Sequence, residues 1–127
     1  MARTQSSRPP VRDRILAAAS RLFYQEGIQN VGVDRIISES GVAKMSLYNH
    51  FKSKDALIAA WLKQRDEEWC TWFHARMDAL STGIDVEGSQ LIAAQRRLLI
   101  IFDVLYEWFE QPNFRGCAFI NSTVELA

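Results

Sequence analysis

The stretch from Val33 to Lys54, which reads VDRIISESGVAKMSLYNHFKSK, constrains the fold more than any other part of this chain. It contains two short segments with apolar residues at helical spacing, separated by Gly41. Because glycine adopts positive φ without a Cβ clash, the sequence predicts two helices joined by a tight turn. This format presents the second helix to a DNA major groove.

The remainder of the chain also has helical periodicity, and no segment alternates with the period of a strand. The sequence therefore predicts an all-α fold, in which a three-helix helix-turn-helix domain precedes an incomplete helical effector and dimerisation domain. We expect a flexible basic arm over residues 1–10, the helix-turn-helix domain over residues 11–53 and the partial second domain over residues 54–127.

Boundary residues locate the expected helices. Gly27 is a natural stop for the first, Ser53 is a candidate N-cap for the fourth, and Pro112 ends the fifth. The expected helices cover about 11–26, 33–40, 44–51, 54–80 and 86–110, and a further helix begins within 114–127.

Charge divides along the chain in a way that favours a polyanionic partner for the first half. The whole chain balances 15 basic against 15 acidic residues. Residues 1–65 hold 11 basic and 5 acidic residues, a net charge of +6, whereas residues 66–127 have a net charge of −6. DNA would be attracted to the half that carries the helix-turn-helix pattern.

The third expected helix can be divided into faces, since successive residues turn by about 100°. Leu47 and Phe51 share the side that must face the core with Val42. The remaining positions form a candidate DNA-reading surface: Lys44, Met45, Ser46, Tyr48, Asn49 and His50.

The chemistry of these side chains suits DNA. Asn49 can pair with an adenine edge, and Met45 can contact a thymine methyl group. Lys44 can reach a guanine or a phosphate. Lys54 adds positive charge to the N-terminus of the fourth helix, which by itself attracts phosphate.

The string SGVAKMSLYNHFKSKDAL resembles the DNA-binding signature of TetR-family transcriptional regulators, and RILAAASRLF followed by Gly27 fits the same pattern. The resemblance covers about residues 11–62. It implies phosphate contacts for Tyr48, His50 and Lys54, and positions near bases for Lys44, Met45, Ser46 and Asn49. In that family the second helix usually opens on Thr or Ser, whereas here Val31-Gly32-Val33 supplies no hydroxyl cap.

Several of these residues also fit a purely structural role. Tyr48 can be a partly buried core aromatic, and this role is compatible with a phosphate contact. His50 taken alone resembles an ordinary surface histidine. Lys52 and Lys54 can simply form a solvated surface. We treat His74, which has no second ligand at metal spacing, as structural or incidental.

Aromatic and apolar residues crowd the fourth and fifth expected helices on almost every side, which indicates buried helices. Such stripes are more often core than pocket. The family resemblance implies that this region binds an apolar or aromatic effector, and it raises five residues to candidate ligand contacts: Trp72, Phe73, Met77, Phe102 and Phe109.

The C-terminal stretch from Asn121 to Ala127 reads as the opening turns of a helix without a stop signal. Family members usually continue through further helices, two of which form a dimer interface. We therefore expect either a truncated form or a longer protein, and a homodimer where the C-terminal region is complete. Exposed apolar helices would otherwise favour association.

The function that these features imply is a DNA-binding transcriptional regulator of a palindromic double-stranded operator, most simply a repressor relieved by a small apolar or aromatic effector. The alternative is a protein of the same fold that a protein partner controls, with no small-molecule ligand. No phosphate loop, nucleophile motif or catalytic carboxylate pair points to an enzyme.

Other classes of site and location are not indicated. Cys70 and Cys117 form no metal-ligand spacing, so we expect no metal and no cofactor. The N-terminus lacks the apolar stretch of a signal peptide, and the apolar run 98–102 is too short to span a bilayer. We expect a cytoplasmic protein without membrane contact.

Overall fold

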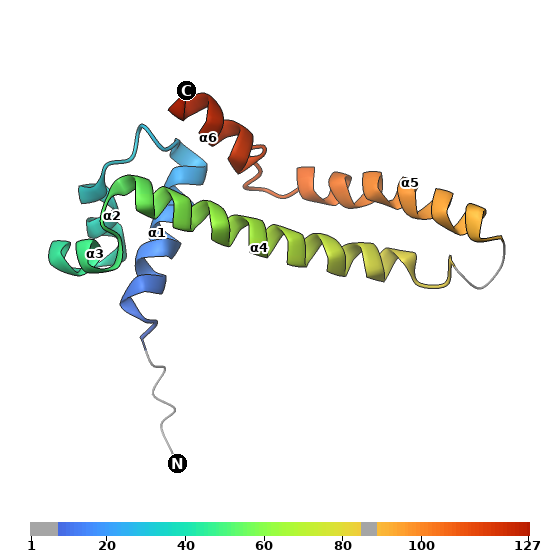
Figure 1. The fold of residues 1–127 in the computed structure, drawn as a ribbon, viewed down its shortest axis with the longest axis horizontal. Coiled ribbons are helices and arrows are strands. Elements are labelled where there is room, and N and C mark those ends of the chain that lie inside the picture. The colour runs from blue at the N-terminus through green and yellow to red at the C-terminus, as the bar shows by residue number, and fades with distance from the viewer. Residues whose placement is uncertain (1–7, 85–88) are drawn as a thin grey trace, which may run out of the picture. The chain divides into compact units, whose positions relative to one another are not determined.

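The structure is a computed structural model that describes residues 8–84 and 89–127. In these residues all regular structure is helical, which confirms the all-α prediction (Figure 1). The helices are α1 (Val11–Glu26), α2 (Val33–Ser40), α3 (Lys44–His50), α4 (Lys54–Ser81), α5 (Gln90–Phe109) and α6 (Ala118–Leu126). They form two compact units, one of residues up to Lys63 together with Cys117–Ala127, the other of Gln64–Gly116.

The predicted helix bounds agree closely with these. The expected bounds of α1 and α2 are confirmed, and α3 ends one residue early, with Phe51 as its C-cap. The α5 helix begins at Gln90, where Ser89 Oγ accepts a hydrogen bond from the Ile92 amide at 3.4 Å. The expected start at residue 86, like most of the basic arm, lies outside the described residues.

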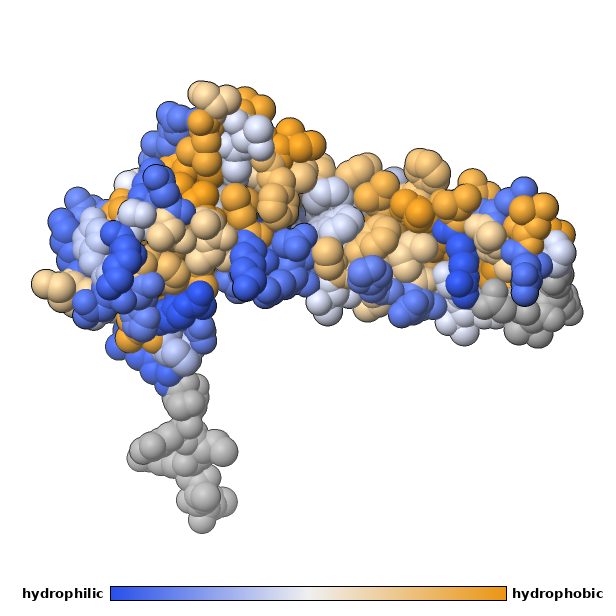
Figure 2. Space-filling view, viewed as in Figure 1, coloured by the Kyte–Doolittle hydropathy of each residue, from blue (hydrophilic) through white to orange (hydrophobic). Residues whose placement is uncertain are grey.

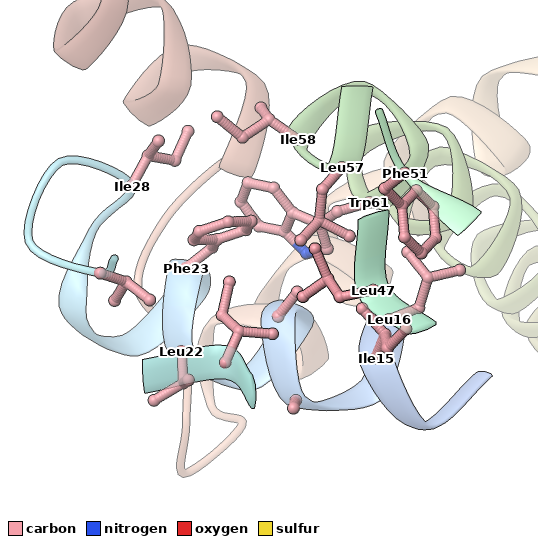
Figure 3. Packing of buried hydrophobic residues seen from close by; sticks show 14 of the residues in the cluster. Ile15, Leu16, Leu22, Phe23, Ile28, Leu47, Phe51, Leu57, Ile58 and Trp61 are labelled. Carbon is pink, nitrogen blue, oxygen red and sulfur yellow. The ribbon is translucent and has the colours of Figure 1, made fainter. Parts of the chain in front are cut away.

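The core of the first unit centres on α1 (Figure 3). The side chains of α1 that repeat at helical spacing, Ile15, Ala18, Ala19, Leu22 and Phe23, are all buried. The Phe23 ring lies against Trp61 of α4, with 5.3 Å between the ring centroids. Because a fully buried large apolar side chain stabilises a fold by about 1.5–3 kcal/mol, α1 anchors the unit.

The first unit reaches beyond the expected domain boundary at residue 53. Leu57, Ile58 and Trp61 from the beginning of α4 are part of its core, and so is Ala118 of α6. Three short helices leave one apolar side uncovered, and these segments cover it. The partition of the structure therefore differs from the expected 11–53 and 54–127.

The α6 helix also makes polar contacts with the loop between α1 and α2. The Gln29 amide donates to Glu125 Oε2 at 3.0 Å, and Gln29 Nε2 donates to the Glu125 carbonyl oxygen. Ser122, which is buried, donates to the Ala118 carbonyl oxygen at 2.7 Å. A segment about a hundred residues away thus packs on the helix-turn-helix unit.

The second unit pairs the later part of α4 with α5. Ile100 and Val104 are its buried α5 residues. Arg76 donates two hydrogen bonds to the Glu107 carboxylate, each of 2.7 Å, and this contact lowers the pKa of Glu107. Across the described parts of both units, no helix has the length and apolarity that crossing a membrane requires.

Candidate nucleic-acid interface

A left-handed glycine makes the turn between α2 and α3. Gly41 has φ 61° and ψ 34°, and its amide donates to the Ile37 carbonyl oxygen at 3.1 Å. Arg14 Nη2 donates at 2.7 Å to the carbonyl oxygens of both Ser40 and Gly41. The Arg14 side chain therefore satisfies carbonyls at the end of α2 and fixes the direction in which α3 leaves the turn.

The predicted facing of α3 is confirmed. Leu47 is fully buried and Phe51 is 4% exposed, whereas Met45 on the opposite side is 72% exposed. Asn49 is also exposed. The α3 helix thus packs its apolar side against the core of the unit. Its outward side carries the Met45 thioether and the Asn49 amide, which are groups that can contact base edges.

The other predicted contact residues surround this face. Lys44 and His50, at the two ends of α3, are exposed, and Ser46 is half-buried. Tyr48 is 38% exposed, so its ring is partly packed and partly accessible. This position is compatible with both predicted roles, a core aromatic and a phosphate contact. The structure thus brings the α3 candidates to one surface, and their contacts with DNA remain predictions.

Two lysines at this surface have protein partners that the sequence did not indicate. Lys44 Nζ lies 3.6 Å from Asp34 Oδ1, and both side chains are well exposed. Lys54 Nζ donates to the Ile28 carbonyl oxygen at 2.7 Å. The exposed Lys44 pair adds little stability, whereas the half-buried Lys54 ammonium has a defined structural role.

The N-termini of α4 and α2 agree with what the sequence predicted for their caps. Ser53 Oγ accepts a hydrogen bond from the Ala56 amide at 3.1 Å, so the predicted N-cap of α4 is confirmed. The N-cap of α2 is Gly32, with no side-chain cap hydrogen bond, as the absence of a hydroxyl there predicted. The α2 N-terminus therefore lacks a side chain that could both cap the helix and contact a phosphate.

Part of the positive charge of the first unit is neutralised on the flank formed by α1 and α2. Arg21 lies 2.6 Å from the Glu39 carboxylate, and Arg35 lies 3.0 Å from Glu26 and 3.5 Å from Glu39. The hydrogen bond and charge of Arg21 lower the pKa of Glu39, with a smaller contribution from Arg35. These two arginines are thus paired with carboxylates of the same unit.

The second unit has an open cavity of about 230 Å³ beside its tryptophans. Its lining residues are Arg65, Glu68, Trp69, Trp72, Trp108 and Gln111. Trp69 and Trp108 meet edge to face at 5.4 Å. Aromatic walls with a few polar groups are typical of small-molecule sites.

Only Trp72 of the five predicted ligand contacts lines this cavity. Phe73 stacks on Trp69 at 4.9 Å, and Met77 is half-buried elsewhere on α4. Phe102 and Phe109 are exposed. Four of the five candidates therefore do not line this cavity, and all five remain predictions as ligand contacts.

The absence of Phe102 from the cavity wall has a geometric cause. Ile100 and Val104 are buried. Phe102 lies two residues from each, a rotation of about 200°, so it points away from α4. The cavity wall contains Trp69 and Trp108, and it contains neither Phe102 nor Phe109. The spacing of Trp69 and Trp72, one turn apart on α4, was the available signal for Trp69.

Comparison with known proteins agrees with this geometry. Residues 15–61 match the family model described as bacterial regulatory proteins, tetR family. The crystal structure of a TetR-family transcriptional regulator from Streptomyces coelicolor is 38% identical, with a TM-score of 0.72 over 91% of this chain and 56% of that one.

Two curated relatives are described as HTH-type transcriptional regulators. One from Staphylococcus aureus is 42% identical over 55 residues, which are 43% of this chain and 29% of that protein. YdgC of Bacillus subtilis is 27% identical over 103 residues, which are 80% of this chain and 49% of that protein. The chain spans about half the length or less of these relatives.

The α2–turn–α3 unit defines this chain as a helix-turn-helix protein. The sequence and structural matches identify the family: the chain belongs to the TetR family of transcriptional regulators.

Proposed function

We propose that this chain is a sequence-specific regulator of transcription that places α3 in the major groove of double-stranded DNA. The observation that carries this proposal is the facing of α3 after the left-handed Gly41. Leu47 and Phe51 hold the helix on the core, and Met45 and Asn49 project outward. Lys44, Ser46, Tyr48, His50 and Lys54 are the further proposed contacts.

Phosphate contacts supply the affinity and register in this proposal, and base contacts supply the specificity. Lys54 bonds to Ile28 through one of three ammonium donors, so two donors remain for a phosphate oxygen. The net charge of +6 over residues 1–65 supports the same partner. The protein acts in the cytoplasm, where it meets this DNA.

Specific binding requires two copies in our proposal. One three-helix head reads only a few base pairs, so a homodimer on a palindromic operator supplies the needed affinity. Half-sites then lie about one helical turn apart, roughly 34–36 Å, or a multiple of that distance. Each copy contributes one α3 to the pair of grooves.

We further propose that a small apolar or aromatic effector controls DNA binding from the second unit, and that it relieves repression. The tryptophan-lined cavity supports this, with Trp69, Trp72 and Trp108 as ring contacts. Control requires a difference in effector affinity between DNA-competent and DNA-incompetent states, typically about 1–3 kcal/mol. By linkage, operator DNA must weaken effector binding by the same factor.

Fluorescence anisotropy with labelled duplexes at low salt tests the DNA proposal. We expect binding whose logarithm falls linearly with the logarithm of salt concentration. Asn49→Asp places a carboxylate on the proposed reading face and should abolish binding. Gln90→Glu makes the same amide-to-carboxylate change at an exposed position of α5 and should leave binding unchanged.

Absence of binding by the unaltered protein at low salt would contradict the proposal. Equal effects of the two substitutions would show that α3 does not approach the DNA.

A further inference from the structure

An arginine in the first turn of α1 lies against the end of α3. The guanidinium carbon of Arg12 is 5.4 Å from the centroid of the Phe51 ring and lies over that ring. Phe51 is the C-cap of α3 and is 4% exposed, whereas Arg12 is exposed. In the described chain no side-chain hydrogen bond is found for Arg12, so the stack leaves its five N–H donors available.

Groups that suit a phosphate lie next to this stack. The His50 and Phe51 ring centroids are 6.5 Å apart, and Lys52 follows Phe51 directly in the chain. Both His50 and Lys52 are exposed. Figure 2 shows largely hydrophilic surface over α3 and the beginning of α1. Arg12 thus shares one surface with His50, which is among the proposed DNA contacts.

Charge pairing distinguishes Arg12 from a second arginine of the same helix. Arg21 lies 2.6 Å from the Glu39 carboxylate. Nine residues are about two and a half turns, so Arg12 and Arg21 lie on opposite sides of α1. Among the described residues, neither Arg12 nor Lys52 has an ion-pair partner. Their charges are therefore not neutralised by carboxylates of the unit.

We propose that Arg12 is a further contact to the phosphate backbone of duplex DNA, and that the Phe51 ring positions it. The inference rests on the proposed function and adds α1 to the interface formed by α3 and the start of α4. A planar guanidinium offers two parallel donors to a phosphate group. Because the stack orients Arg12 in advance, less side-chain freedom is lost when the phosphate binds. The contact then fixes the position of α3 from a second helix.

Salt-dependent anisotropy with a labelled duplex of random sequence tests the contact. Arg12→Gln should weaken binding about tenfold at low salt and reduce the salt slope by about 0.9 for each bound copy. A second duplex of unrelated sequence should show the same loss, because a phosphate contact carries no sequence information. Arg21→Gln is the matched control, since it makes the same change on the opposite side of α1. It should leave the slope unchanged.

Two further variants test the positioning by Phe51. Arg12→Lys keeps the charge and loses the planar fork, so it should keep the slope and weaken binding about threefold. Phe51→Leu removes the ring and keeps an apolar side chain in the core. In that background Arg12→Gln should cost less than about threefold, because an arginine without its stack contributes less to binding. Thermal unfolding of each variant shows whether the unit remains folded.

A purely structural Arg12 would give a different result. Arg12→Gln would then lower the unfolding temperature and leave the salt slope unchanged. That outcome, or an equal reduction of the slope by Arg12→Gln and Arg21→Gln, would overturn the contact. An Arg12→Gln loss of equal size with and without the Phe51 ring would overturn the positioning role.

Asn49→Asp separates this contact from the proposed function. If Asn49→Asp abolishes binding while Arg12→Gln keeps the full salt slope, the Arg12 contact alone is overturned. If the unaltered protein binds no duplex DNA at low salt, the proposed function and the Arg12 contact are overturned together.

Discussion

Lys54 Nζ, at the beginning of α4, donates a hydrogen bond of 2.7 Å to the carbonyl oxygen of Ile28 in the loop between α1 and α2. The next residue of that loop, Gln29, bonds to Glu125 of α6. One short loop therefore connects α1 and α2 to both of the later helices of the first unit. A lysine that was predicted to serve phosphate also holds the unit together.

Lys54→Met should lower the free energy of unfolding by about 1–2 kcal/mol, because it removes a charged donor from a carbonyl oxygen. Lys52→Met, at an exposed neighbouring position, is the control and should change stability by less than about 0.5 kcal/mol. Urea denaturation followed by circular dichroism measures both. Equal stabilities for the two variants would show that the Lys54–Ile28 bond contributes nothing.

Arg14→Gln should destabilise the chain by about 1–2 kcal/mol, since the guanidinium bonds to the carbonyl oxygens of both Ser40 and Gly41. Arg12→Gln is the comparison. Arg12 stacks over the Phe51 ring at 5.4 Å, an exposed cation–π contact of about 0.5–1 kcal/mol. Chemical denaturation should rank the Arg14 variant as the less stable, and the reverse order would contradict the turn-fixing role of Arg14.

Asn49→Ala should cost roughly 1–3 kcal/mol of binding free energy on the specific operator only, because a base contact carries sequence information. Lys52→Ala should instead weaken operator and random duplexes alike and reduce the salt slope by about one, if Lys52 neutralises one phosphate. Anisotropy titrations on both duplexes separate the two patterns. A uniform loss for Asn49→Ala would remove this residue from the reading face.

Acid should weaken the second unit through Glu107. The hydrogen bond from Arg76 lowers the pKa of Glu107 below its ordinary 4.5. A depressed pKa in the folded state means that this ion pair stabilises the fold above pH 4.5 and that the contribution is lost as the pH falls through the lowered value.

Glu107→Gln should therefore reduce stability at pH 7 and flatten the decline of stability below pH 4.5. Glu110→Gln, a control carboxylate for which no ion pair is found among the described residues, should leave the decline unchanged. Thermal unfolding at a series of pH values gives both profiles. An unaltered acid profile for Glu107→Gln would rule out this linkage.

The sequence predicted the parts of the fold that depend on local periodicity. The positions of Leu47 and Phe51 defined the inward side of α3, because a short amphipathic helix has only one apolar side to bury. The turn at Gly41 and the Ser53 cap depend on backbone preferences of single residues, and both are present.

Long-range and ambiguous contacts could not be predicted in the same way. The bond between Gln29 and Glu125 joins polar residues 96 positions apart, and no periodicity relates them. On α5, apolar residues occur on almost every side, so the pattern did not distinguish the packed Val104 from the exposed Phe102. The pattern therefore did not predict that Phe102 would lie outside the tryptophan-lined cavity.

Selection of duplexes from a random pool, followed by sequencing, tests the central claim most directly. The account predicts enrichment of an inverted repeat whose half-site centres lie about 10 base pairs apart or a multiple of that spacing. The same selection with Asn49→Ala should lose base preference at one position in each half-site. A pool that shows no enriched sequence, or an enriched sequence that Asn49→Ala leaves unchanged, would contradict reading of DNA by α3.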